Sequence, residues 1–195
     1  MVRRTDVRER MVAAARRLFR EHGYLGTALS DVIAESAAPR GSLYFHFPGG
    51  KGELATEVSL LHSSEVIAHV NRVAGNTDSA EEFIAGFMAH FRDEIVGSGY
   101  RQGCAVAPIV IECTPASAPL SDVTRRGFSD VITTVAARLA EKSVPEEAAR
   151  SLATLAVTTM EGALILSRAL RNPEPFDTAI TVLTAATQDA VGAHR

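Results

Sequence analysis

Apolar residues recur at spacings of three and four along most of the chain, which is the pattern of helices with one buried face. The first such stripe predicts a helix over residues 6–22, ended by Gly23. Shorter stripes predict two short helices, separated by a turn over residues 36–38. One follows Thr27 and the other starts at Pro39, because proline suits the first position of a helix.

Longer stretches with the same periodicity fill the rest of the chain. They predict helices over residues 51–73, 78–96, 120–142, 145–171 and 175–193. Residues 104–113 are short and mostly apolar and fit a buried strand as well. We favour a helix there because no second strand is available to pair with it. The sequence therefore predicts an all-α chain of about nine helices.

The penultimate predicted helix is apolar nearly all round, which is typical of a helix buried on more than one side. It and the last helix are rich in small residues, which favour close packing against a second copy of the chain. Both helices could instead complete the core of a single copy. On the dimer interpretation, the predicted interface residues are Leu155, Gly162, Leu166, Phe176, Ile180 and Leu183.

The composition adds little to this pattern but excludes several classes of protein. Of 195 residues, 46% are hydrophobic and 22% charged, which excludes global disorder. The two cysteines cannot form a disulfide framework. No apolar run approaches the roughly 20 residues of a membrane span, and the N-terminal residues lack an apolar signal-peptide stretch. We therefore expect a reduced, cytoplasmic protein without a membrane partner.

The net charge of −3 hides an asymmetry between the two ends of the chain. Residues 1–52 contain nine Lys and Arg against five Asp and Glu, whereas the rest of the chain is acidic. A basic head on an acidic body suggests a polyanionic partner for the head, although basic helix faces can also be simply solvated.

Three short helices with a tight turn before the third form the geometry of a helix-turn-helix, whose last helix enters the major groove of DNA. Here the residues also resemble the TetR family of bacterial repressors. The motifs that carry this resemblance are Phe19-Arg20-Glu21-His22-Gly23-Tyr24, Thr27, Asp31-Val32-Ile33 and the run from Arg40 to Phe47. Ala37 and Pro39 depart from the glycine and serine usual in that family.

Two domains follow from this resemblance. Residues 1–50 are the expected helix-turn-helix domain, and residues 51–195 the expected helical domain for effector binding and dimerisation. Leu43 and Phe47 are predicted core residues of the head. The predicted contacts with DNA are Thr27, Arg40, Gly41, Ser42, Tyr44, Phe45, His46 and Lys51. The expected partner is a palindromic double-stranded operator, bound by a homodimer.

The body resembles a subgroup of TetR regulators that includes repressors of multidrug and lincomycin efflux genes, some of which flavonoids release. The matching segments are residues 47–51, 103–107 and 161–164. The resemblance implies a small hydrophobic or aromatic effector. Candidate effector contacts are Phe87, Phe91, Cys104, Glu112, Phe128 and Met160, although plain core or structural roles are favoured for them.

Two other functions remain as alternatives. The chain could be a DNA-binding dimer without an effector, or a small helical enzyme, although no spacing typical of a catalytic motif appears. Gly49-Gly50-Lys51-Gly52 lacks the first glycine and the Ser/Thr of a phosphate-binding loop. His62, His69 and His90 do not form a metal-ligand spacing with either cysteine. We therefore predict no cofactor, no metal site and no catalytic residues.

Overall fold

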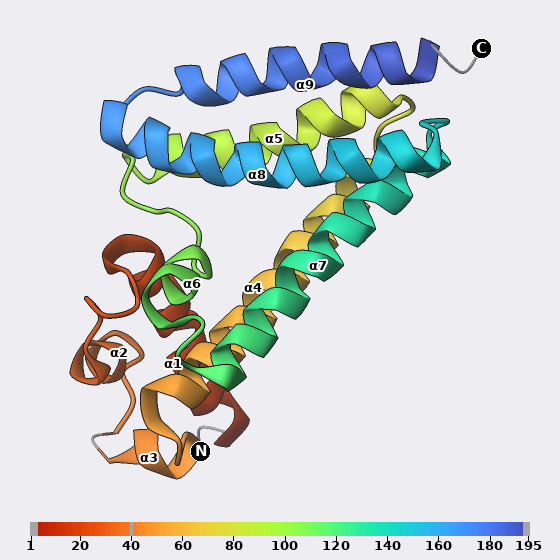
Figure 1. Cartoon of the computed structure of the whole chain (residues 1–195). Helices are drawn as coiled ribbons and strands as arrows, with labels where there is room; N and C mark the ends of the chain where they lie inside the picture. The colour runs from red at the N-terminus through yellow and green to blue at the C-terminus, as the bar shows by residue number, and fades with distance from the viewer. Residues whose placement is uncertain (1–3, 40, 193–195) are drawn as a thin grey trace. The chain divides into compact units, whose positions relative to one another are not determined.

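The computed structural model describes residues 4–39 and 41–192 and confirms the all-α prediction (Figure 1). These ranges contain nine helices and no strand. The helices are α1 (Arg4–His22), α2 (Leu29–Glu35), α3 (Ser42–His46), α4 (Gly50–Gly75), α5 (Ala80–Gly97), α6 (Ala107–Cys113), α7 (Ala118–Glu141), α8 (Glu146–Leu170) and α9 (Glu174–Gly192).

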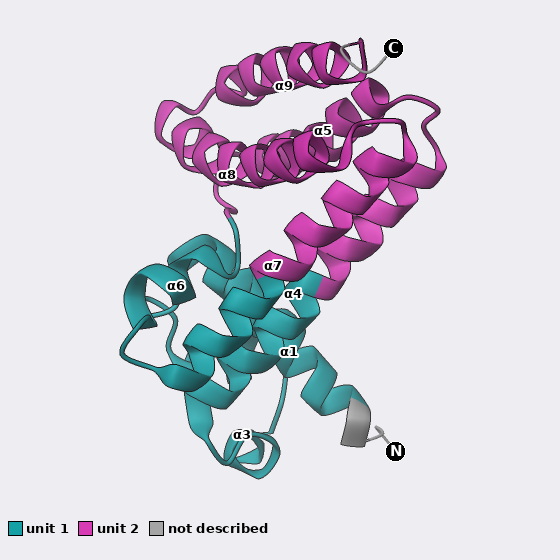
Figure 2. Ribbon diagram, turned by 45° about the vertical axis from the view of Figure 1, so that its right-hand side comes forward, with its two compact units in different colours: residues 1–63, 104–127 teal, residues 64–103, 128–195 magenta. Residues whose placement is uncertain are grey.

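The chain folds into two compact units, coloured separately in Figure 2. Unit 1 consists of residues 1–63 and 104–127, and unit 2 of residues 64–103 and 128–195. Unit 1 thus contains α1, α2, α3 and α6 together with the first parts of α4 and α7. The predicted boundary after residue 50 divides the chain by function, whereas the two units divide it by how its residues pack. The functional boundary therefore stays a prediction.

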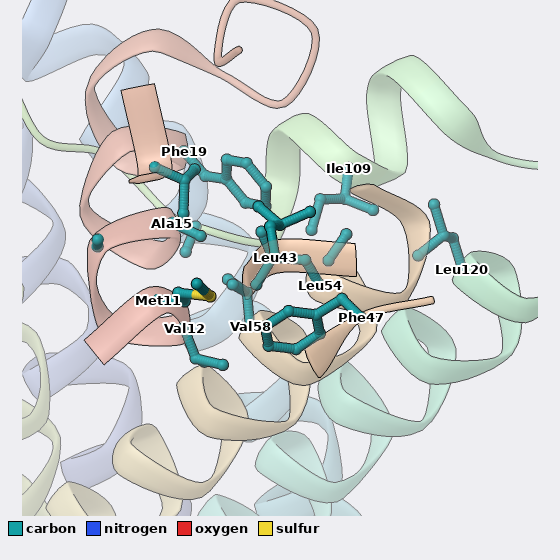
Figure 3. Close-up of a cluster of buried hydrophobic side chains, with 14 of the residues drawn as sticks. Met11, Val12, Ala15, Phe19, Leu43, Phe47, Leu54, Val58, Ile109 and Leu120 are labelled. Carbon is teal, nitrogen blue, oxygen red and sulfur yellow. The ribbon is translucent and has the colours of Figure 1, made fainter. Parts of the chain in front are cut away.

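One apolar core holds unit 1 together, and its side chains converge in Figure 3. Helix α1 supplies Met11 and Phe19, and α3 supplies Leu43, all at most 1% exposed. Other buried members of the cluster come from α4, α6 and α7: Leu54, Ala55, Val58, Ile109, Leu120 and Val123. Burying large side chains from every helix of the unit fixes the short α2 and α3, which are too short to be stable alone.

The start of α3 differs from the prediction. The described helix begins at Ser42 rather than at Pro39. Gly41 precedes it with a φ of 94°, a left-handed conformation that is open to glycine but does not continue a right-handed helix. The carbonyl of Pro39 instead accepts hydrogen bonds from both the backbone N–H and the hydroxyl of Ser42. Pro39 therefore belongs to the turn before the helix.

In unit 2, helices α5, α8 and α9 lie side by side (Figure 1). Ser79 caps α5 by accepting the backbone N–H of Glu82, whose carboxylate accepts the N–H of Ser79 in return. The inward faces of these helices contribute a second set of fully buried aromatic and aliphatic side chains, among them Phe83, Ile84, Phe87, Met88, Ile95 and Phe176.

Two regions bear on the sequence-based expectations. The short apolar segment is helical, as predicted, over Ala107–Cys113, and within the described residues neither Cys104 nor Cys113 forms a disulfide. Helix α8 is the one helix among the described residues that is long and apolar enough to cross a membrane by length and composition. The expectation that no apolar stretch approaches this length was therefore too strict. A core helix passes the same test, and buried side chains such as Leu152, Val157 and Leu164 agree with that role.

Candidate nucleic-acid interface

The short helix α3 presents two aromatic side chains outward while it is anchored from within. Leu43 and Phe47 are at most 1% exposed and belong to the core of unit 1. Tyr44 and Phe45, between them, are 65% and 62% exposed. Exposed apolar side chains that lie next to each other, rather than singly, are typical of binding sites. The buried pair fixes the orientation of α3, and the exposed pair forms a surface that a partner can contact.

The neighbours of these rings complete the exposed face of α3. His46 is half-buried and packs edge-on against Phe45, with ring centroids 5.1 Å apart. Gly41 has open space where a Cβ would lie, so a partner can approach its backbone closely. The hydroxyl of Ser42 is engaged with Pro39, 2.7 Å away. Arg40, a predicted contact with a guanine edge or a phosphate, lies outside the described residues.

Thr27 occupies the segment between α1 and α2, and its side chain is only 1% exposed. Its hydroxyl donates to the carbonyl of Gly23 at 2.8 Å, which closes the turn at the end of α1. The hydroxyl thus has an internal partner, a role that the sequence did not indicate. A contact between this residue and a phosphate stays a prediction.

Lys51, in the first turn of α4, lies over the ring of Tyr24, with 4.5 Å between the ammonium nitrogen and the ring centroid. Partial burial lowers the pKa of Lys51, while the nearby Glu112 and Cys113 act in the opposite direction. Burial also raises the pKa of Tyr24, as do Cys113 and Glu112. Lys51 is therefore held near the end of α1, and its predicted contact with a phosphate stays a prediction.

Ion pairs tie α1 to the helices that carry this face. Arg8 pairs with Glu57 of α4 at 2.8 Å, and its guanidinium lies 5.2 Å from the ring centroid of Phe47. Arg17 pairs with Glu35 at the end of α2. Such partly exposed pairs contribute little to stability individually, but they restrict how α2 and α3 sit on α1.

The predicted effector contacts fall into both units. Phe87, Phe91 and Met160 are buried in unit 2, where Phe128 is half-buried. Cys104 and Glu112 belong to unit 1. The sulfur of Cys104 lies 3.6 Å from Nε2 of His62 and accepts the backbone N–H groups of residues 106 and 107. Glu112 is exposed, and its carboxylate accepts the N–H of Leu25 at 2.6 Å.

A buried histidine accompanies the phenylalanines in unit 2, and the sequence did not single it out as a site residue. His69 of α4 stacks on His90 of α5, with ring centroids 3.9 Å apart, and meets the edge of Phe91 at 6.0 Å. Both of its ring nitrogens are buried. A polar group in this position is costly unless something pairs with it. The pairing of α4 with α5 becomes visible only in the folded chain, because 21 positions separate the two rings.

The predicted dimer residues are placed unequally. Leu155 and Leu166 of α8 are 47% and 53% exposed, whereas Phe176 and Leu183 of α9 are buried inside unit 2. Ile180 is half-buried. Gly162 lines a mostly apolar groove of about 410 Å³ between α8 and α9. The other lining residues are Thr159, Ala163, Leu166, Leu170, Glu174, Pro175 and Thr178. The exposed leucines and this groove form an apolar face, defined here as the α8/α9 face.

Within residues 4–39 and 41–192, no group of three or more His, Cys, Asp or Glu side chains is placed to hold a metal ion.

Comparison with known proteins agrees with the helix-turn-helix geometry. Residues 11–58 match the model of the N-terminal domain of bacterial regulatory proteins of the tetR family. Residues 80–182 match the C-terminal domain of LmrA/YxaF-like transcriptional regulators.

Relatives that match over most of the chain are also transcriptional regulators. An HTH-type transcriptional regulator of Mycobacterium tuberculosis is 35% identical over 87% of this chain and 88% of its own length. The HTH-type transcriptional regulator LmrA of Bacillus subtilis is 32% identical over 88% of this chain and 91% of its own length. The crystal structure of a TetR regulator from Chloroflexus aurantiacus superposes with a TM-score of 0.75, at 28% identity and 93% coverage of both chains. The chain therefore belongs to the TetR family of transcriptional regulators, with a tetR-type DNA-binding domain and an LmrA/YxaF-like C-terminal domain.

Proposed function

We propose that this regulator is a repressor that binds a palindromic operator through α3 and leaves it when a small aromatic molecule binds to the body. The observation that carries the DNA-binding part is the contrast between a buried pair, Leu43 of α3 and Phe47 directly after it, and an exposed pair in α3, Tyr44 and Phe45. A rigid helix with exposed side chains suits insertion into the major groove. Phe45 is suited to a thymine methyl group and Tyr44 to a phosphate.

The proposed assembly is a homodimer formed through the α8/α9 face. The exposed Leu155 and Leu166 and the apolar groove would otherwise remain in contact with water. A two-fold dimer presents two copies of α3 to half-sites about 34–36 Å apart, which is one turn of DNA. This arrangement accounts for a palindromic operator.

The proposed effector site lies in unit 2, near Phe87, Phe91 and the buried ring nitrogens of His69. A buried cluster of aromatic rings with one polar group suits a flat molecule that carries a hydroxyl or carbonyl group and that enters when the helices move apart. The dimer has one form that fits the operator and another in which the two copies of α3 are spaced differently. A ligand that binds the second form more tightly lowers the affinity for the operator. This loss of affinity cannot exceed the difference in the ligand's affinity for the two forms. The resemblance of the body to efflux regulators favours a neighbouring efflux or detoxification gene as the target, in the cytoplasm of a bacterium.

The first experiment measures binding of the full-length protein to labelled DNA from the region upstream of its own gene, at two salt concentrations. We expect specific binding that weakens steeply with salt, since each phosphate contact contributes about −0.9 to the log–log slope. Tyr44→Ala and Phe45→Ala should each weaken specific binding by about tenfold, the loss of roughly 1.4 kcal/mol. Val96→Ala, a partly exposed position on α5, is the matched control and should bind like the wild type.

Two outcomes contradict parts of the proposal. The first is that the upstream DNA shows no specific binding and a selection of bound fragments from the whole genome yields only non-specific binding. In that case α3 does not recognise a sequence. If aromatic compounds raise the melting temperature without weakening operator binding, the body binds ligands but does not release DNA through them.

A further inference from the structure

Helix α6 contacts the segment between α1 and α2 through one carboxylate. Oε2 of Glu112 accepts the backbone N–H of Leu25 at 2.6 Å, although the two residues are 87 positions apart. A Cβ at Gly23 would lie 3.0 Å from Oε1 of the same carboxylate and 3.8 Å from the side chain of Pro108. Both carboxylate oxygens thus lie against the segment, and Gly23 leaves the space that they need.

Hydrogen bonds within the contacted segment hold it together. The N–H of Thr27 donates to the carbonyl of Tyr24, and its hydroxyl donates to the carbonyl of Gly23. Tyr24 also packs edge-on against Phe19 of α1, with ring centroids 5.5 Å apart. Residues 23–27, hereafter the α1–α2 segment, therefore set the direction in which α2 leaves α1.

Glu112 itself is held in place from the core of unit 1. Ile109, one helical turn earlier on α6, is fully buried in the cluster that also contains Val32 of α2 and Leu43 of α3. Helix α6 therefore contacts the helix-turn-helix region at two places. It reaches α2 and α3 through the shared core, and it reaches the α1–α2 segment through the Glu112 carboxylate.

We propose that Glu112 is a positioning residue for operator recognition, whose bond to the Leu25 N–H fixes the α1–α2 segment and with it the orientation of α2 and α3. This inference rests on the proposed function, because it concerns the specific binding of DNA by α3. Glu112 does not touch DNA in this role. It acts through the α1–α2 segment, so it affects recognition of the correct sequence rather than general attraction to phosphates.

The test compares Glu112→Gln with Glu112→Met in the full-length protein. Both variants remove the same negative charge and keep a similar length, but only glutamine keeps an oxygen that accepts the Leu25 N–H. We expect Glu112→Gln to bind the operator within about twofold of the wild type. Because the bond is exposed, we expect Glu112→Met to bind about fivefold more weakly, at the lower end of typical coupling effects. Binding to random DNA of equal length should be the same for the two variants.

Glu82 offers a matched control in unit 2. Its carboxylate also accepts backbone N–H groups, from Asp78 and Ser79, but it caps α5. Glu82→Gln and Glu82→Met should differ in thermal stability and not in operator affinity. Hydrogen exchange of the Leu25 amide supplies a readout that needs no DNA, and it should be faster in Glu112→Met than in Glu112→Gln.

The outcomes separate this inference from the proposed function. Equal operator affinity of the two Glu112 variants, or equal exchange of the Leu25 amide, overturns the positioning role. A wild-type protein that recognises no operator overturns the proposed function instead, while the amide exchange still decides whether Glu112 holds the segment.

Discussion

Lowering the pH from about 7.5 to about 5 is expected to reduce the free energy of unfolding through His69, which lies between α4 and α5. Burial lowers the pKa of His69 to about 4, and the nearby His90 and Arg72 act in the same direction. The backbone of Phe87 and the carboxylate of Glu94 oppose this only weakly. The folded chain therefore keeps the ring neutral at a pH where an exposed histidine is charged.

The sign and size follow from the two pKa values. The unfolded chain takes up a proton near pH 6.5 and the folded chain only near 4, so between these values the unfolded state binds more protons. Stability is complete above about pH 6.5 and falls as the pH drops toward 4. The full difference is worth about 3 kcal/mol, of which roughly 2 kcal/mol is already lost at pH 5. His62 adds a loss in the same direction, since burial lowers its pKa to about 3.

The assay is urea unfolding at several pH values, with His69→Phe as the test variant because phenylalanine keeps a flat ring without a titrating group. Its loss of stability between pH 7.5 and 5 should be about 2 kcal/mol smaller than that of the wild type. The same comparison with exposed His22→Gln is the control and should follow the wild type. The reasoning is refuted if His69→Phe and the wild type lose the same free energy over this range.

Three further predictions concern the core, a helix cap and the proposed interface. Phe47→Ala should destabilise unit 1 by about 3–5 kcal/mol in chemical unfolding, because a fully buried ring leaves a cavity. A loss below about 1 kcal/mol would contradict its place in the core. Ser79→Ala should cost about 1 kcal/mol by removing the cap of α5, whereas Ser79→Asp should restore most of it. Leu166→Glu on the α8/α9 face should shift the protein toward monomers in sedimentation, and an unchanged dimer would show that this face is not the interface.

Much of the fold was predictable from the sequence because helical periodicity is a local property. Leu43 and Phe47 were predicted to be core residues, and both are buried. The start of α3 was not predictable from Pro39 alone, because proline suits both the first turn of a helix and the turn before it. What decides is the left-handed conformation of Gly41, which the spacing of apolar residues does not reveal.

The contacts between distant parts of the chain were less predictable. Glu112 was predicted as an effector contact, and nothing local indicated that it would accept the Leu25 N–H. The stacking of His69 on His90 depends likewise on how α4 and α5 pack. Phe176 was predicted to lie in a dimer interface, yet it is buried within unit 2, where α9 packs against α5 and α8.

The inclusion of residues 104–127 in unit 1 has a consequence for building hybrid regulators. Ala105, Ile109 and Leu120 complete the same apolar cluster as α1 and α3. If residues 1–50 were fused to the effector domain of another regulator, these three side chains would be replaced by those of the foreign domain. The replacements would not be matched to the apolar cluster of α1 and α3. A working exchange therefore has to transplant two separate stretches of chain together. The head of this regulator is a discontinuous module and not a single N-terminal segment.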